Sequence, residues 1–245
     1  MRKDFWFKLN VFALCLIFSG CAGFTPGLRY PEIGRQESTV KEVQDGLEMS
    51  VAEFASPHKS QGAFNADIAP YGVLALLVRA ENTGNQIYMV QRRNIKVFLG
   101  DKPLPSLPSE AAADQGAARE YFGKALFWAI LPGPLNIFFA LPGIAAFTAS
   151  VAHTSGVNRR VQQHFVDMQF NDAFLRPNQM VAGFLYFALP DGVQKLEKLT
   201  IEAEASETQS GKAIYHKLSH PTVELSAPVV TRIFEGPSEE KKEVK

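Results

Sequence analysis

Short segments in which apolar and polar residues alternate recur along this chain, and they limit its fold more than any other feature. A period of two residues places the apolar side chains on one face of a strand. The alternation is found at 47–51, 78–81, 95–99, 199–205 and 214–218. Residues 72–77 are apolar enough on both faces to begin a central strand, and 180–189 is expected to be a strand rich in Phe and Tyr. The expected class is mainly β with a helical insert (α+β): an antiparallel β-sandwich whose first strands form a meander.

The N-terminus has a short basic start, an apolar run and then a cysteine. Arg2, Lys3 and Lys8 precede an apolar run from Leu9 to Phe18, and Ser19-Gly20 then leads to Cys21. These features resemble a bacterial lipoprotein signal, and the resemblance implies a signal peptide at 1–20 and a lipid on Cys21, which becomes the new N-terminus. An ordinary signal peptide or a buried N-terminal helix is the alternative.

Cleavage before Cys21 has chemical consequences for the mature chain. Cys15 leaves with the signal and Cys21 carries the lipid, so neither a disulfide nor a cysteine-bound metal is expected. The mature chain keeps 22 basic and 24 acidic side chains, a net charge of about −2. Such a surface does not attract nucleic acid, so we expect no nucleic-acid partner.

Composition divides the remaining chain. Residues 21–43 mix Gly, Pro and charge without a period and are expected to be a tether. A β-sandwich-like domain is expected at 44–234 with a helical insert at 109–168, and 235–245 is charged and expected to be disordered.

A family resemblance covers about half of the mature chain. It rests on the strand-turn-strand stretch from Gly72 to Leu99 and on the aromatic strand that follows Pro177-Asn178-Gln179, with the later turn Pro190-Asp191-Gly192. These features resemble immunoglobulin-like bacterial lipoproteins of unassigned function. The resemblance implies an immunoglobulin-like sandwich and an envelope location, with the large insert as a departure.

The insert contains no charged residue from 125 to 152. Pro132-Gly133-Pro134 and Pro142-Gly143 interrupt this stretch, so an apolar hairpin is expected, with one leg from an N-cap at Ser109 to Leu131 and another from Leu135 to Ala152. It either covers a sheet face or contacts a membrane or an envelope partner. In the second case Trp128, Phe138 and Phe139 would make the contact, with Arg159 and Arg160 beside lipid phosphates.

An amphipathic helix is expected after the hairpin. Val157, Val161, Phe165 and Met168 follow helical spacing and could cap the sheet, leaving Arg159 and Arg160 on another face. His164 in this helix is expected to be a satisfied, partly buried imidazole.

No chemical motif indicates catalysis. His216 and His220 share a strand face but lack a third ligand, so a surface or strand-end pair is expected rather than zinc, and no metal or cofactor is expected. Hydrolase, phosphate-loop and dinucleotide motifs are missing from the sequence. Arg92-Arg93 with Lys96 indicates an exposed strand edge or, alternatively, a contact for anionic lipid or glycan.

The expected function is therefore a non-enzymatic binding or assembly module of the cell envelope. Because Ala22 rather than Asp follows the cysteine, the lipoprotein resemblance implies the periplasmic leaflet of the outer membrane in a two-membraned bacterium. One alternative is an accessory subunit of a transport or secretion complex that uses 125–152 as its contact. Another is an envelope hydrolase without a recognisable motif.

Overall fold

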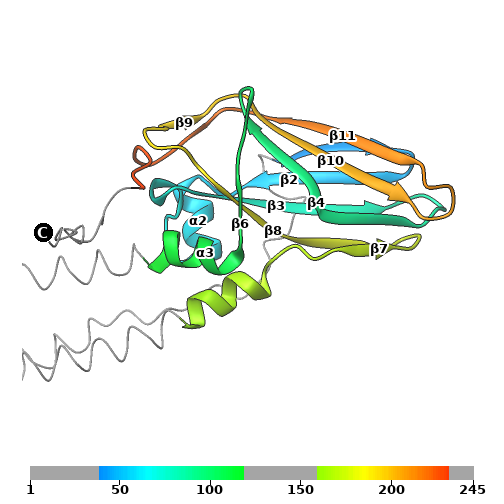
Figure 1. Cartoon of the computed structure of the whole chain (residues 1–245), viewed down its shortest axis with the longest axis horizontal. Coiled ribbons are helices and arrows are strands. Elements are labelled where there is room, and N and C mark those ends of the chain that lie inside the picture. The colour runs from blue at the N-terminus through cyan, green and yellow to red at the C-terminus, as the bar shows by residue number, and fades with distance from the viewer. Residues whose placement is uncertain (1–38, 119–158, 232–245) are drawn as a thin grey trace, which may run out of the picture.

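A computed structural model of the chain describes residues 39–118 and 159–231 (Figure 1). The fold is mainly β, with antiparallel sheets and a few helices. The strands are β1 (Thr39–Gln44), β2 (Leu47–Glu53), β3 (Val73–Asn82), β4 (Tyr88–Leu99), β5 (Lys102–Pro103), β6 (Ser106–Leu107), β7 (Ala173–Leu175), β8 (Met180–Ala188), β9 (Lys195–Leu196), β10 (Leu199–Glu207), β11 (Ala213–His220) and β12 (Val223–Glu224). The helices are α2 (Pro57–Phe64), the 3-10 helix η1 (Ala69–Tyr71), α3 (Ser109–Ala113), the π-helix η2 (Asp114–Ala118) and a return helix at 159–167.

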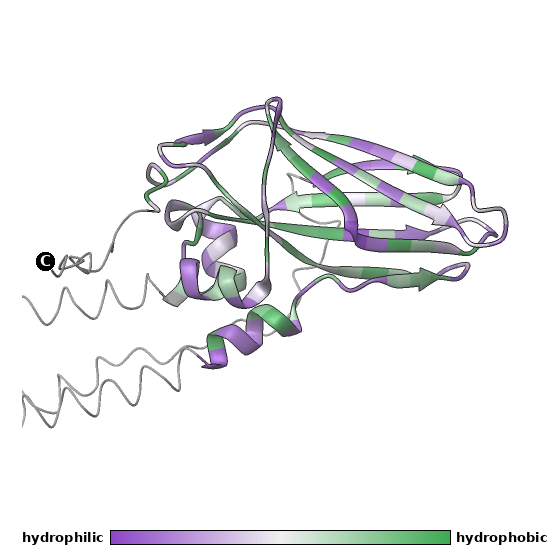
Figure 2. Cartoon of the chain, viewed as in Figure 1, coloured by the Kyte–Doolittle hydropathy of each residue, from purple (hydrophilic) through white to green (hydrophobic). Residues whose placement is uncertain are grey.

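Two sheets pack face to face. Sheet A has the order β1-β2-β3-β8-β6, and sheet B has the order β11-β10-β4-β5 with β7 also paired to β4. Hydrophobic and hydrophilic residues alternate along β10 and β11 of sheet B (Figure 2). The apolar faces form one buried cluster that joins Leu74 and Leu76 of sheet A to Val97 and Ile201 of sheet B. This cluster is the main core of the domain.

Strand β3 lies in the middle of sheet A and is covered on both faces. Its residues from Val73 to Val78 are fully buried. Leu74, Leu76 and Val78 face sheet B, whereas Val73 and the alternate residues after it face a second apolar cluster. The prediction of a central strand from this apolar run is confirmed.

The second cluster lies between sheet A and a layer of helices. It joins α2, α3, η2 and the return helix to the outer face of β3 and β8 at one end of the sheet (Figure 1). Phe64 is at its centre, with ring centroids 4.8 Å from Phe165 and 5.0 Å from Phe184. Burial of each such ring contributes about 1.5–3 kcal/mol, so these contacts fix the helices on the sheet.

The predicted meander of the first strands holds for β2 and β3, which pair antiparallel, and is wrong for the strand after them. Strand β3 pairs with β2 and β8 in sheet A, whereas β4 pairs with β10 in sheet B. The chain therefore changes sheets after Asn82, whose buried side chain holds the turn. Its Nδ2 donates to Gln86 O and Leu175 O, at 2.7 and 2.9 Å, and its Oδ1 accepts from Gly84 N.

Two local predictions also differ from the structure. Strand β1 begins at Thr39, inside the segment expected to be a tether. Its alternating pattern is short and lies among charged residues, so the sequence does not reveal it. Residues 57–64, which show no apolar period in the sequence, form α2, whose apolar side chains are confined to its last residues, Ala63 and Phe64. Helix α3 has Pro108 rather than Ser109 as its N-cap residue, and Ser109 Oγ instead donates to Gln169 Oε1.

Candidate interaction surface

The two chain segments that flank residues 119–158 lie beside each other. Helix α3 continues into η2, which ends at Ala118, and the return helix is described from residue 159. Gln162 Nε2 of the return helix donates to Asp114 Oδ1 of η2 at 2.8 Å. Figure 1 shows α3 and the return helix next to each other. The chain thus leaves and rejoins the described domain at neighbouring helices.

The return helix packs through one apolar face. Val161, Phe165 and Met168 are buried in the second cluster, and the Phe165 ring stacks on Tyr186 with centroids 5.1 Å apart. Tyr186 Oη also donates to Phe165 O at 3.2 Å. The prediction of an amphipathic helix that caps the sheet is confirmed for these described residues.

Two of the predicted contact residues are described. Arg159 and Arg160, the first two described residues of the return helix, are exposed. Cys21, Trp128, Phe138 and Phe139 lie outside the described residues, as does the uncharged stretch 125–152. Within 39–118 and 159–231, no helix has both the length and the apolar character needed to cross a bilayer.

Both outer limits of the described domain lie at its helical end. Thr39 is paired with Ala52, whose side chain belongs to the second cluster. Thr231 lies next to Gly72 and Gln115. If Gly72 carried a Cβ atom, that atom would lie 2.7 Å from Thr231 Cγ2 and 2.8 Å from Gln115 Nε2. The helical end therefore carries the connections to residues 1–38, 119–158 and 232–245.

The histidines of the described chain differ in burial and in their hydrogen bonds. His164 is buried with its Nε2 2.8 Å from Ala63 O, which confirms the expected satisfied imidazole, and His58 is exposed. In the part of the chain that the structure describes, no three His, Cys, Asp or Glu side chains gather as a metal site.

His216 differs from the expected surface or strand-end position. The alternation of β11 turns it into the interior, where it is only 1% exposed, and among the described residues neither ring nitrogen has a hydrogen-bond partner. Glu42 Oε2 lies 3.9 Å from Nδ1 and accepts a hydrogen bond from Lys217 N at 2.7 Å. Burial lowers the pKa of His216, and the nearby Glu42 carboxylate opposes this shift with a smaller effect.

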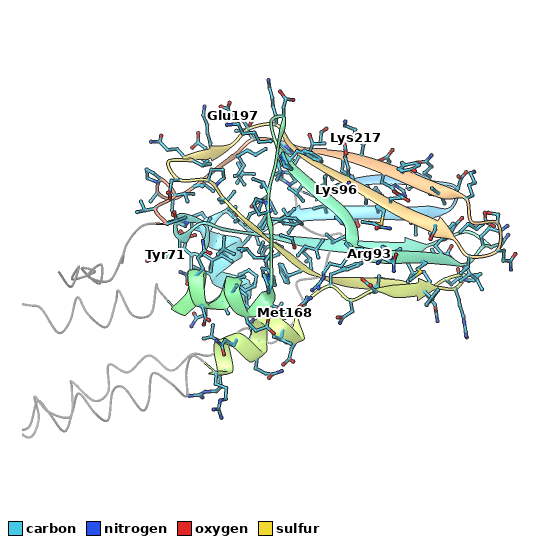
Figure 3. The ribbon with its side chains drawn as sticks, in the orientation of Figure 1. Tyr71, Arg93, Lys96, Met168, Glu197 and Lys217 are labelled. Atoms are coloured by element: carbon cyan, nitrogen blue, oxygen red, sulfur yellow. The ribbon has the colours of Figure 1, made fainter. Side chains whose placement is uncertain are left out.

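The basic cluster on β4 is exposed, as expected for a strand edge. Figure 3 shows Arg93 and Lys96 along this strand. The third member, Arg92, borders a polar cleft that the sequence did not indicate. The other walls come from residues 106–110 and from Gln169. No local motif could have revealed the cleft, since its walls are brought together from three distant segments.

Comparison with known proteins supplies no relative. Neither the models of known protein families nor the curated protein sequences give a match to this chain.

Proposed function

We propose that this protein is anchored to a membrane by lipid on Cys21 and acts as a non-enzymatic binding or assembly module of the bacterial envelope. Residues 125–152 would provide its contact with the membrane or with an envelope partner. The observation that carries the proposal is the hydrogen bond between Asp114 and Gln162, because it joins the two helices that flank this uncharged stretch.

The arrangement of the chain supports one membrane-facing end. Residues 22–38 connect the lipidation site to Thr39 and can extend over no more than about 60 Å. Since Thr39 lies at the same end of the domain as α3 and the return helix, a lipid on Cys21 would keep the ends of 119–158 near the bilayer. In a two-membraned bacterium we place the anchor in the periplasmic leaflet of the outer membrane.

Charge and aromatic content fit such a contact. Arg159 and Arg160 are exposed beside the uncharged stretch, where guanidinium groups can meet lipid phosphates. Trp128, Phe138 and Phe139 would supply interfacial aromatic side chains. Stable attachment is already achieved by two acyl chains, at about 0.8 kcal/mol per buried methylene, so the apolar stretch is more useful as a specific contact than as a second anchor.

We also propose that the sandwich is immunoglobulin-like. In that fold one sheet has the strand order A-B-E-D and the other has the order G-F-C. The order β2-β3-β8-β6 in sheet A and β11-β10-β4 in sheet B corresponds to this pattern, with the segment that contains 119–158 between strands D and E. An experimental structure with a different pairing of β8 or β10 would contradict this assignment.

Two measurements test the proposed function. Labelling of cells with a palmitate analogue should mark the wild-type chain but not Cys21→Ser. A chain with Cys21→Ser and a cleavable secretion signal should still float with anionic liposomes, and changing Trp128, Phe138 and Phe139 to Ser should abolish flotation. Phe174→Ser is the matched control, because Phe174 is exposed on β7.

The result with liposomes decides between the two contacts. A monomer that ignores liposomes would exclude membrane contact by 125–152. Loss of one defined cross-linked envelope protein in the same aromatic variants would then favour the accessory-subunit function. If neither flotation nor cross-linking depends on these residues, the contact proposed for 125–152 is wrong.

A further inference from the structure

The polar cleft beside β4 has a volume in the range of small-ligand sites. Its volume is about 350 Å³, within the range of about 300–1,000 Å³ for ligand sites. It is lined by Arg92, Ser106, Leu107, Pro108, Ser109, Glu110 and Gln169. All of these residues belong to the described parts of the chain.

A strand bulge forms one wall. Ile95 of β4 is paired with Ala203 of β10, whereas Val90 is paired with Ala205, so residues 91–94 stand opposite Glu204 alone. Extra residues of this kind re-aim side chains and are common next to functional sites. Asp172 Oδ1 holds the bulge by accepting a hydrogen bond from Arg92 N at 2.7 Å.

The opposite wall is fixed by packing. Ser109 is 2% exposed, and its Oγ donates to Gln169 Oε1. The chain after Gln169 is held on β8 by the hydrogen bond from Phe170 N to Phe184 O. It lies so close to Gly183 that a Cβ there would stand 2.5 Å from the Phe170 backbone.

The cleft is lined by one basic and one acidic residue that are not paired. Among the described residues, neither Arg92 nor Glu110 has an ion-pair partner, and both residues line the cleft. The Ser106 hydroxyl and the Gln169 amide add neutral hydrogen-bonding groups. We infer that the cleft binds a small zwitterion of about dipeptide size, with its anionic group at Arg92 and its ammonium group at Glu110.

The position of the cleft gives such a ligand a structural role. Arg92 belongs to the sandwich, Glu110 lies in α3, and Gln169 directly follows the turn that ends the return helix. A bound zwitterion would therefore connect the sandwich to both helices that flank 119–158. This site is independent of lipidation at Cys21, so either proposal can fail alone.

Calorimetric titration of the detergent-solubilised full chain with L-alanyl-L-alanine tests the inference. The cleft is open to solvent, so each ion pair is expected to change affinity only about fivefold. Wild-type protein should bind the dipeptide about fivefold more tightly than its carboxyl-amidated or amino-acetylated form. Arg92→Gln should bind the free and the carboxyl-amidated dipeptide equally well and should still bind the amino-acetylated form more weakly. Glu110→Gln should bind the free and the amino-acetylated dipeptide equally well and should still bind the carboxyl-amidated form more weakly.

Matched controls separate the cleft from general surface charge. Lys96→Gln and Asp101→Asn change exposed charges outside the cleft lining and should keep both preferences. An unchanged melting temperature shows that each variant is folded. No saturable binding of the dipeptide at about 50 mM would overturn the inference, as would equal weakening in the control variants.

A second probe identifies the source of the zwitterion. Phosphoethanolamine carries the same pair of groups as a lipid headgroup. If phosphoethanolamine binds more tightly than the dipeptide, and if Arg92→Gln and Glu110→Gln weaken this binding but the control variants do not, the site is supported and its ligand is a lipid headgroup. Tighter binding of the dipeptide with the same dependence assigns it to a peptide.

Discussion

Replacing His216 with leucine should remove an acid-sensitive part of the folding free energy. Because burial lowers the pKa of this imidazole, the unfolded chain takes up its proton at a higher pH than the folded chain does. In an unfolded chain the pKa of a histidine is about 6.5. The stabilisation is therefore present above that pH and is lost as the pH falls below it, toward the folded pKa.

The size of the effect follows from the single proton involved. When the unfolded state holds one more proton than the folded state, the free energy of unfolding falls by about 1.4 kcal/mol for each unit by which the pH is lowered. If His216 stays neutral in the fold, the loss between pH 7.5 and 5.5 reaches about 1.4 kcal/mol. This value is the upper limit, and Glu42→Gln should bring the loss closer to it, because the Glu42 carboxylate raises the pKa of His216.

Urea denaturation of the full chain at pH 5.5, 6.5 and 7.5, followed by circular dichroism, measures this loss. The difference between wild type and His216→Leu isolates one group, because the other titrating residues are common to both. Tyr215→Leu, an exposed change on the same strand, should keep the wild-type acid sensitivity. Parallel pH profiles of wild type and His216→Leu, within about 0.3 kcal/mol, would refute the reasoning.

Two substitutions test the packing of the sandwich by the same denaturation assay. Asn82→Ala should lower the free energy of unfolding by about 2–4 kcal/mol, because the buried partners of the Asn82 amide lose their hydrogen bonds. Asn85 is exposed, so Asn85→Ala should change the free energy of unfolding little. Equal effects of the two substitutions would contradict the role given to Asn82. Gly183→Ala should destabilise by about 1–3 kcal/mol through collision with Phe170. Gly62→Ala in α2 has free space and should be neutral or stabilising, so a reversed order of these two glycine variants would show that the close approach is misassigned.

Strands with a clear period could be predicted from the sequence, and their positions are confirmed. The alternation at 199–205 and 214–218 corresponds to β10 and β11, and the apolar runs correspond to β3 and β8. Their pairing could not be predicted, because alternation assigns faces and not neighbours. This is why β3 and β4 were expected to be adjacent in one sheet although the turn at Asn82 leads to the other sheet.

The candidate surfaces were predictable only in part. The exposure of Arg159 and Arg160 followed from the helical spacing of Val161 and Phe165, which are buried on the other face. The buried position of His216 could have been inferred from its phase with Ile214 and Leu218. The cleft could not, because it depends on the register shift between β4 and β10 and on tertiary contacts between distant segments.

The contact between Asp114 and Gln162 also bears on the length of the connection between them. The entropy lost on closing a chain between two adjacent points grows only slowly with the number of residues in the connection. A short Gly-Ser linker should therefore replace 119–158 without altering the sandwich. By the same reasoning, evolution could exchange the segment at this position for others of different length and composition while the scaffold beneath it stays the same.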